Sequence, residues 1–434
     1  MKYAVYYLFL LLFLQCCTIT GPSGIFGKKS PHEQYGLNLS SAGLENTALG
    51  RAWFSQAEQS LSKPLRIEVP YRESGYFPAD RALATALRFE ARQGEKITIS
   101  LQKKPAINFT IYIDLWKDNN GKNKKLLAYA DSSGNPFSHD IDESGTYILR
   151  LQPELLSAGE YTLTLTNGPS LAFPVKNGRL GSFWGADRDA GVRRHEGVDI
   201  FAPKRTPAVA AAPGVVNRVG ENKLGGRVVF FRPEGKNYSL YYAHLDEQLV
   251  TEGQRVQLGD TLGLVGNTGN AAFTPSHLHF GIYTSGGAVD PLPFIDQTVR
   301  SPAKLSAPLG LLGKSVRTKQ AKGNLRSGPG ADEQLLSSLP AGSLMQVYAA
   351  TSAWYKVLLP NGEYGFISSS SVNEVNTPVR QVKLAAGKPL LDKPDTAAAR
   401  KTDLNAGEVV GVLGSFENYY FVEAKAGSGW IVRE

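Results

Sequence analysis

The sequence predicts a mainly β, multidomain protein, and three observations point to that class. The chain has 434 residues, which is more than one ordinary hydrophobic core accommodates. Its 45 glycines and 25 prolines are typical of a chain with many turns, and the runs between them are short and rich in Val, Ile, Tyr and Thr. Several stretches near the C-terminus also recur at an offset of about 65 residues, which indicates a repeated small unit.

The composition and the spacing of these runs divide the chain into segments. In chain order we expect a signal segment over 1–17, a flexible tether over 18–44, a β-sandwich domain over 45–175, a histidine-rich domain over 176–300, a linker over 301–312, and two small β units over 313–376 and 377–434.

The N-terminus is typical of an export signal. Lys2 supplies the positive end, and the apolar run from Val5 to Leu14 is shorter than the about 20 residues that span a bilayer. The following Leu14-Gln15-Cys16-Cys17 resembles a bacterial lipobox, so we expect a lipid anchor on Cys17 or Cys16 and a location in the periplasm or cell envelope. The alternative is simple cleavage, with both cysteines merely ending the apolar run. These are the chain's two cysteines, so we expect no disulfide in the mature domains.

The charge of the chain limits the classes of partner. The formal net charge is +8, and the basic residues are dispersed along the sequence. Such a distribution suits attraction to an anionic polymer such as peptidoglycan, or to a membrane surface. Nucleic acid is not expected as a partner, because no basic run is interleaved with aromatic residues.

Alternating strands predict the β-sandwich. Residues 107–113 alternate apolar and polar side chains, and two similar arms follow at 145–149 and 159–163. The turn at 118–123 has the Asp and Asn residues of a calcium loop, but Lys122 occupies a position where an oxygen ligand is needed. We therefore expect a plain hairpin turn there.

Two copies of one β unit are expected at the C-terminal end. Leu339 and Leu404 begin matching stretches, and Gly365-Phe366-Ile367 corresponds to Gly429-Trp430-Ile431. The segment 324–330 resembles the opening of bacterial SH3-like domains, whereas the corresponding segment 389–395 of the second copy has diverged from it. The resemblance implies two SH3-like barrels, which in exported hydrolases often bind cell-wall peptides or glycans.

Four of the six histidines lie between residues 195 and 279 and form a candidate zinc site. Zinc takes nitrogen and oxygen ligands at about 2.0–2.2 Å, and a catalytic site keeps one position open. In His277-Leu278-His279 the two imidazoles would lie on one strand face about 7 Å apart, so one should bind zinc and the other should face the open position. His195 and Asp199 would be about 13 Å apart on a straight strand, so the chain must bend between them, and Gly197 allows that bend.

These residues resemble the lysostaphin/LytM-type zinc metallopeptidases of bacterial cell walls. The resemblance covers residues 181–294 and is carried by the segments 195–200, 202–204, 211–216, 242–245, 266–269 and 277–280. It implies an antiparallel β peptidase domain with one zinc ion per chain, bound by His195, Asp199 and His279, and a zinc-bound water as nucleophile. By the same resemblance, His277 would be the general base and His244 would stabilise or protonate the tetrahedral intermediate.

Two departures from the family pattern concern the edges of the site. Family members commonly have Phe-Gly-Tyr-Arg before the first ligand, but the stretch 183–188 lacks the Tyr, which puts an accessory substrate contact in doubt. Arg205 replaces the usual Gly after Ala-Pro-Lys, so one edge of the cleft should differ.

The expected function is hydrolysis of peptide cross-links or stem peptides in bacterial peptidoglycan. The competing hypothesis is a non-catalytic peptidoglycan-binding protein that activates a cell-wall amidase; a third is a protease that acts on proteins. Residues 250–263 also resemble hairpins of biotinyl and lipoyl carrier domains, but the turn at 266–269 has no Lys to carry the prosthetic group. All five predicted ligand and acid–base positions are present, which favours the enzyme.

Overall fold

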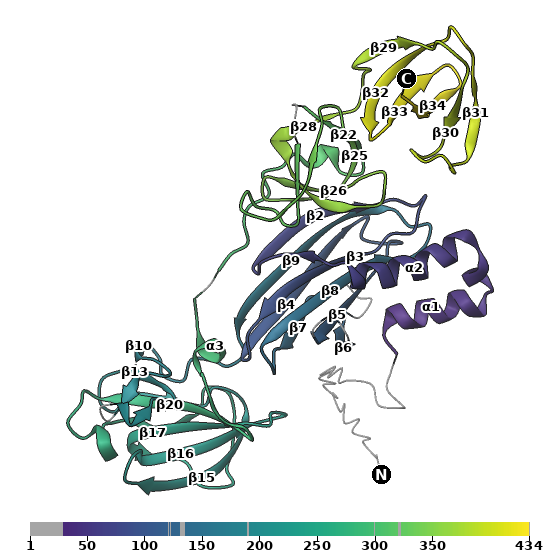
Figure 1. Cartoon of the computed structure of the whole chain (residues 1–434). Coiled ribbons are helices and arrows are strands. Elements are labelled where there is room, and N and C mark those ends of the chain that lie inside the picture. Colours follow the sequence, from purple (N-terminus) through teal and green to yellow (C-terminus); the bar gives the residue numbers. More distant parts are fainter. Residues whose placement is uncertain are drawn as a thin grey trace, which may run out of the picture.

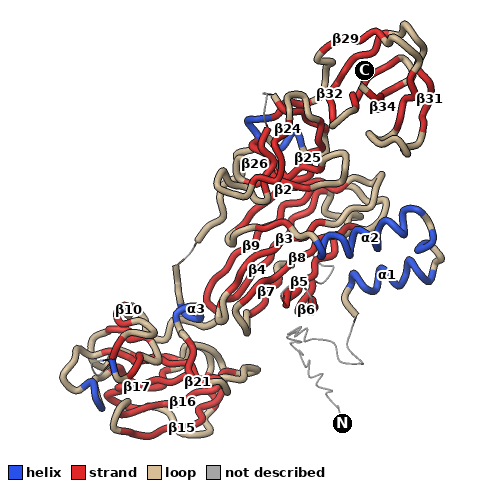
Figure 2. Tube along the Cα trace, in the orientation of Figure 1, coloured by secondary structure: helices blue, strands red, loops and turns tan. Residues whose placement is uncertain are grey.

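The computed structural model describes residues 29–119, 121, 123–130, 135–188, 191–298, 300–319 and 323–433. Strands dominate this part of the chain, and the sheets follow one another along an extended molecule (Figure 1, Figure 2). The mainly β, multidomain class is therefore confirmed. The predicted signal segment, with Cys16 and Cys17, lies outside the described residues. Within the described ranges, no helix combines the length and the apolar character that crossing a membrane requires.

The described chain begins with a helical hairpin. A tether was expected over 18–44, and the described part of that range, from residue 29 on, is helical instead. The elements of the hairpin are α1 (Pro31–Ser41), the 3-10 turn η1 (Leu44–Asn46) and α2 (Ala48–Ser62). The start of α1 is a capping box, in which Ser30 Oγ accepts from Glu33 N at 3.1 Å and Glu33 Oε2 accepts from Ser30 N at 2.9 Å. Pro31 suits the first helical turn, where no backbone donor is needed.

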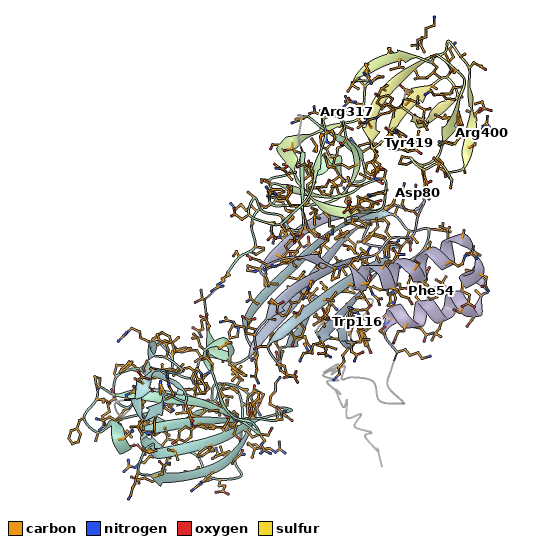
Figure 3. The ribbon with its side chains drawn as sticks, viewed as in Figure 1. Phe54, Asp80, Trp116, Arg317, Arg400 and Tyr419 are labelled. Carbon is orange, nitrogen blue, oxygen red and sulfur yellow. The ribbon has the colours of Figure 1, made fainter. Side chains whose placement is uncertain are left out.

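The hairpin packs against one face of the following domain. Trp53 is buried, and its Nε1 donates to the carbonyl of Pro153 at 3.0 Å. Its ring contacts a small apolar cluster with Leu39 and Tyr112. Figure 3 shows Phe54 on this hairpin and Trp116 on the sheet below it. The Gly, Ser and Asn content that suggested a tether is overridden by this tertiary packing.

The next domain is a sandwich of two antiparallel layers, except for one short parallel strand. The first layer has the strand order β1 (Leu65–Arg66), β3 (Thr85–Ala91), β8 (Gly145–Pro153), β5 (Ile111–Asn119), β6 (Asn123–Tyr129). The second layer has the order β2 (Tyr71–Phe77), β9 (Gly159–Pro169), β4 (Glu95–Lys104), β7 (Phe137–Asp140). Leu87 and Leu149 from the first layer meet Ile97 and Leu165 from the second in one buried core.

The histidine-rich domain is built on an antiparallel ten-stranded sheet. Its main path runs β10 (Arg179–Ser182), β13 (Val198–Phe201), β20 (His277–Thr284), β17 (Ser239–Gln248), β16 (Gly226–Pro233), β15 (Gly214–Asn222), β18 (Arg255–Val256). Beside this path lie β14 (Pro207–Val209), β19 (Thr261–Val265), β21 (Gly287–Val289), the separate hairpin of β11 (Asp187–Arg188) with β12 (Arg193–Arg194), the turn η3 (Gly269–Ala271) and the short helix α3 (Leu292–Ile295). One apolar core underlies the sheet.

Two small β units follow, and they share one pairing order. The first contains β22 (Ser315–Thr318), β23 (Gly323–Arg326), β24 (Leu335–Leu339), β25 (Leu344–Thr351), β26 (Trp354–Leu358), β27 (Tyr364–Ser368), β28 (Val372–Glu374) and the turns η4 (Leu309–Leu311) and η5 (Ser369–Ser371). The second contains β29 (Arg380–Lys383), β30 (Lys388–Leu391), β31 (Arg400–Leu404), β32 (Val409–Phe416), β33 (Tyr419–Ala424) and β34 (Gly427–Val432). The path β24-β23-β27-β26-β25-β22 of the first unit has its counterpart in β31-β30-β34-β33-β32-β29 of the second, as the sequence repeat predicts.

The two C-terminal units are in direct contact. Arg317 donates to the carbonyls of Thr377 and Leu413 at 2.8 and 2.7 Å, and Tyr419 joins the apolar core of the first unit. Figure 3 shows Arg317 and Tyr419 at this contact.

The first C-terminal unit continues a sheet of the sandwich. Strand β25 pairs antiparallel with β2, with Ser74 opposite Ala350 and Gly75 opposite Ala349. Below this pairing Lys356 Nζ donates to both carboxylate oxygens of Glu73 at 2.9 Å, and both side chains are almost fully buried. The sandwich and the first unit therefore share backbone hydrogen bonds and a buried ion pair.

The histidine-rich domain lies at the opposite end of the sandwich from the two C-terminal units (Figure 1). Its junction includes the hydrogen bond from Leu171 N to Phe294 O at 2.9 Å, and Phe294 packs so closely on Gly94 that a Cβ there would lie 2.2 Å from the ring. The chain thus leaves the sandwich after β9, forms this domain, and returns to pair β25 with β2. The exact domain boundaries stay predictions.

Candidate metal centre and active site

Two neighbouring strands bring the predicted ligands together. Strands β13 and β20 pair so that Asp199 lies opposite His279 and Phe201 lies opposite His277. Successive side chains of a strand point to opposite faces. Val198, Ile200, Leu278 and Phe280 therefore fill the core beneath the sheet, and the polar members of both strands share the other face.

The chain bends between His195 and Asp199, as the sequence predicts. Strand β12 ends at Arg194 and β13 begins at Val198, so His195 lies in the connection. Gly197 is needed there for space, because a Cβ at this position would lie 2.6 Å from His279 Cε1 and 2.7 Å from Phe280 O. The glycine lets the His279 ring approach the bend.

Three ligand atoms converge above the two strands. His195 Nε2 lies 3.0 Å from Asp199 Oδ1 and 2.9 Å from His279 Nδ1, and His279 Nδ1 lies 3.0 Å from Asp199 Oδ1. Together the three side chains form a group that could hold a metal ion, with ligand atoms all within 4.8 Å of one another. Two imidazoles and one carboxylate are a donor set that suits zinc.

The hydrogen bonds behind the ligands decide which nitrogen faces the centre. His195 Nδ1 lies 2.9 Å from the carbonyl of Phe183, and a carbonyl can only accept, so Nδ1 carries the proton. In the neutral ring, Nε2 then presents a lone pair toward Asp199 Oδ1. A proton on His279 Nδ1 can form a full hydrogen bond with only one of the two acceptors, His195 Nε2 or Asp199 Oδ1. A divalent cation can bind all three atoms. The donor set therefore fits a bound metal.

His277 and His244 stand beside the ligand group and do not join it. His277 Nδ1 donates to the carbonyl of Pro275 at 2.8 Å, and its Nε2 lies 3.9 Å from Asp199 Oδ1. His244 Nδ1 donates to the carbonyl of Thr268 at 2.9 Å, and its ring centre is 5.0 Å from that of His277. In each ring the Nδ1 proton is thus engaged by a backbone carbonyl. The structure brings all five predicted site residues together.

The backbone at His244 adopts an unusual conformation. Its φ is 62°, in the left-handed region that residues with side chains rarely occupy. The backbone N–H of His244 donates to Gly225 O at 2.7 Å, which anchors this conformation from the neighbouring turn. Strained backbone of this kind persists where surrounding contacts determine it, and it often aims a functional side chain.

Burial and neighbouring charges set the protonation of the group. Burial alone would raise the pKa of Asp199, but its close contacts with the imidazoles of His195 and His279 outweigh burial and hold the pKa well below its usual range. Burial, followed by the nearby His277, lowers the pKa of His244 to about 4. Burial also lowers the pKa of His279. The carboxylate of Asp199 is thus charged and the imidazole of His279 is neutral near pH 7, which is the state that metal binding requires of these two ligands.

The structure adds a contact that the sequence does not predict. Arg188 Nη2 donates to Asp199 Oδ2 at 2.7 Å and to Ser182 Oγ at 3.0 Å. In the sequence, Arg188 ends the stretch that is compared with Phe-Gly-Tyr-Arg, but nothing there indicates its contact with Asp199. The carbonyl acceptors at Phe183, Pro275 and Thr268 also have no sequence signal, because any residue type supplies a carbonyl.

The backbone conformation at Arg205 is one that favours glycine, the residue usual at this position in the family. Its φ is 69°, a conformation that glycine adopts without strain. The exposed guanidinium pairs with Asp246 and Glu247 at 2.8 Å each, which connects this turn to strand β17.

Two segments of the chain match known families. Residues 193–291 match the model of Peptidase family M23, and residues 321–373 match that of the Bacterial SH3 domain. The predicted resemblance to lysostaphin/LytM-type peptidases, with an SH3-like unit behind the peptidase segment, is thereby confirmed.

Curated relatives match over part of their length. An uncharacterized metalloprotease of Haemophilus influenzae is 37% identical over 138 residues, which cover 31% of this chain and 27% of that protein. The peptidoglycan DD-endopeptidase ShyC of Vibrio cholerae is 35% identical over 127 residues, covering 29% and 27%. The L-Ala–D-Glu endopeptidase of Bacillus subtilis is 37% identical over 126 residues, covering 26% and 38%. The matched segment thus spans 27% to 38% of these relatives.

Proposed function

We propose that this protein is a zinc-dependent endopeptidase that hydrolyses peptide cross-links or stem peptides of bacterial peptidoglycan. One observation carries the proposal: the ligand atoms of His195, Asp199 and His279 converge. A divalent cation could bind all three atoms at once, whereas a proton cannot. The match to Peptidase family M23 supports peptidase chemistry. The relatives named as peptidoglycan DD-endopeptidase and L-Ala–D-Glu endopeptidase support the substrate class.

His195, Asp199 and His279 would hold one zinc ion per chain. When bound, zinc supplies Lewis acidity, which polarises a carbonyl and lowers the pKa of a water towards about 7. Phe183 O fixes the His195 ring through its Nδ1 proton, so that Nε2 faces the centre. The carboxylate of Asp199 would offset part of the cation's charge within a largely buried site.

His277 would be the general base. Because its Nδ1 proton is donated to Pro275 O, the lone pair of Nε2 is free to take a proton from a water beside the ligand group. Nε2 also lies 3.9 Å from Asp199 Oδ1, which places it beside the ligand group where such a water would be held. The ring could then return the proton to the leaving amine.

His244 would act on the developing oxyanion. Its neutral Nε2 is an acceptor, so stabilising an oxyanion requires a proton at that atom. Thr268 O, which accepts from Nδ1, would stabilise the resulting imidazolium. The negative charge that develops during attack would itself favour uptake of this proton from the solvent.

The remaining segments would hold the enzyme at the cell wall. We propose an exported protein of the periplasm or cell envelope, anchored to a membrane by a lipid on Cys17 or Cys16. The net charge of +8 favours an anionic polymer, and the bacterial SH3 segment at 321–373 suits attachment to the wall.

Metal content and two neighbouring histidines test the catalytic proposal. The purified protein should contain close to one zinc per chain, and a chelator should abolish digestion of purified peptidoglycan. His277→Ala should keep the metal and lose turnover, whereas His279→Ala should lose both. His139→Ala, in the sandwich and outside the group, should lose neither.

Three outcomes would contradict this account in different ways. Digestion by His277→Ala at the wild-type rate would make the assigned base wrong. A metal-loaded wild-type protein that binds peptidoglycan without cleaving it would indicate a binding protein. Cleavage of unrelated proteins at a similar rate would indicate a general protease.

The lipid anchor has a separate test. Cys17→Ala should release the mature protein from membranes if Cys17 is modified, and Cys16→Ala serves as the matched variant. Unchanged membrane fractionation of the double variant would contradict the anchor without affecting the catalytic proposal.

A further inference from the structure

The two oxygens of the Asp199 carboxylate have different surroundings. Oδ1 faces the imidazoles of His195 and His279 at 3.0 Å each. Oδ2 accepts from Arg188 Nη2 at 2.7 Å. The side chain of Asp199 is 8% exposed, so this guanidinium meets a carboxylate that is largely removed from water. One oxygen is therefore directed to the metal centre, and the other is held by a cation.

Arg188 belongs to the structural unit that also positions His195. It lies on β11, whose partner β12 pairs Arg188 with Arg193 and Asp187 with Arg194, and His195 follows β12 directly. The backbone of His195 is bound to the same turn, since its N–H donates to Ala186 O at 2.8 Å and its carbonyl accepts from Gly185 N at 2.9 Å. The hairpin thus controls one ligand through the backbone and another through the Arg188 side chain.

A second contact restricts the guanidinium. Arg188 Nη2 also donates to Ser182 Oγ at 3.0 Å, and Ser182 lies on β10 directly opposite Asp199 of β13. The donor is therefore held between a neighbouring strand and the carboxylate. Arginine differs from lysine here, because its planar fork loses less freedom than a flexible ammonium when it is fixed in one orientation.

Occupation of Oδ2 limits how Asp199 can bind a metal ion. A carboxylate that uses both oxygens fills two coordination positions, whereas one that uses a single oxygen fills one. Turning the carboxylate so that both oxygens face the centre would break the charge-assisted bond with Arg188 and leave a half-buried guanidinium without its partner. A catalytic zinc site needs a position free of protein ligands.

We propose that Arg188 is a positioning residue that confines Asp199 to metal binding through Oδ1 alone and so preserves the open coordination position. This inference rests on the proposed metal site. Arg188 acts through Asp199, and we assign it no contact with the substrate. Residues behind a metal ligand commonly change metal affinity by about 10- to 100-fold when they are replaced.

The test compares metal binding in Arg188→Gln, Arg188→Lys and wild type, with Arg194→Gln as the matched control. Arg194 lies in the same hairpin, where its exposed guanidinium pairs with Asp187 and donates to Gly185 O at 3.1 Å without reaching Asp199. Competition with a coloured chelator should give a zinc dissociation constant about 10- to 100-fold weaker for Arg188→Gln. Arg188→Lys should fall between, and Arg194→Gln should match wild type.

Cobalt substitution gives a readout that a loss of stability alone would not change. Four-coordinate cobalt absorbs visible light more strongly than five-coordinate cobalt does. In Arg188→Gln the released Oδ2 should join the ion, so the visible absorption per bound cobalt should decrease, while Arg194→Gln keeps the wild-type spectrum. If Arg188→Gln folds poorly, the spectrum of Arg188→Lys carries the same comparison.

The outcomes separate this inference from the proposed function. A wild-type protein that takes up neither zinc nor cobalt contradicts the metal site itself. A wild-type protein that loads normally, together with Arg188 variants of unchanged affinity and spectrum, contradicts only the positioning role. Weaker zinc binding with an unchanged cobalt spectrum also overturns the proposal, because Arg188 would then affect affinity without controlling the coordination of Asp199.

Discussion

Glu73 and Asp199 are both buried carboxylates, and comparing them shows what distinguishes a structural charge from a functional one. At the junction between the sandwich and the first C-terminal unit, Glu73 accepts from Lys356 through both oxygens. Tyr71 OH donates to Oε2 at 2.8 Å, and Tyr161 OH donates to Oε1 at 2.7 Å. Each oxygen of Glu73 thus has two donors.

The carboxylate of Asp199 has fewer hydrogen-bond donors than that of Glu73. Oδ2 accepts a hydrogen bond from Arg188, but Oδ1 faces the lone pair of His195 Nε2 and lies 3.0 Å from His279 Nδ1. Nothing in this arrangement supplies every acceptor with its own proton. Glu73 is satisfied by its own chain, whereas Asp199 is best satisfied by a cation from outside.

The difference has an energetic consequence. A buried charge with all its hydrogen bonds holds two parts of the chain in one arrangement, although its net contribution to stability can be small. A group of converging acceptors stabilises the fold only when its ligand is bound, and it costs stability otherwise. The four predictions that follow test this contrast, from the largest expected effect to the smallest.

The largest effect is expected from Lys356→Met. The substitution leaves Glu73 charged and buried without its cation, which should lower the free energy of unfolding by about 3–5 kcal/mol. Urea denaturation measures the loss. Adding Glu73→Gln to the same chain should recover most of it, because the uncompensated charge is then gone. A single variant as stable as wild type would show that the junction does not depend on this pair.

Zinc should stabilise the histidine-rich domain around Asp199. At a hundredfold excess over its dissociation constant, zinc should raise the free energy of unfolding of the histidine-rich domain by about 2.7 kcal/mol. Hydrogen exchange followed by mass spectrometry should detect slower exchange in β13 and β20, with β2 and β25 unchanged, and a chelator should reverse it. Equal slowing in all four strands would contradict the independence of the two clusters.

Gly197→Ala should weaken zinc binding without adding or removing a charge. Its Cβ would lie 2.6 Å from His279 Cε1, so the ring must shift away from His195 and Asp199. We expect a loss of about 10- to 100-fold in zinc affinity, similar to other disturbances behind a metal ligand. Gly286→Ala in the same domain is the control, because its Cβ would meet only Thr284 Oγ1 at 3.7 Å. Equal affinity in both variants would contradict the need for space at Gly197.

The smallest effect concerns His32, which helix α1 buries against the sandwich. Its Nε2 donates to Gln152 Oε1 at 2.6 Å, and its Nδ1 accepts from Arg150 Nη2 at 3.0 Å. Burial, followed by the charge of Arg150, lowers the pKa of His32 below 6.5, although Asp114 and Glu33 oppose the shift. The unfolded chain therefore takes up this proton at a higher pH than the folded chain does.

The stability from neutral His32 is present above pH 6.5 and is lost as the pH falls from there toward the lowered pKa. Urea denaturation at about pH 7.5 and about pH 5.5 should give a larger decrease in wild type than in His32→Gln, which does not titrate. An equal decrease in both proteins would show that His32 remains neutral in the unfolded chain or is charged in the folded one.

Much of the candidate site could be predicted from the residues themselves. The alternation in His277-Leu278-His279-Phe280 determines that Leu278 and Phe280 enter the core and that both histidines share the opposite face. The spacing of His195 and Asp199 requires a bend, and the chain bends there. The repeat near the C-terminus likewise predicts two units, and their strands pair in the same order. Side-chain identity and strand periodicity are local properties, so the sequence alone determined these features.

Contacts between distant segments were decided only in the tertiary structure. Helix α1 lies in the segment where a tether was expected, and it depends on packing with Trp53. Strand β25 depends on an edge of β2 to pair with. The choice of Asp199 Oδ1 for the ligand group depends on Arg188 reaching Oδ2, and the orientation of His195 depends on the carbonyl of Phe183. A sequence specifies which groups can donate or accept, but their partners depend on which strands lie side by side after folding.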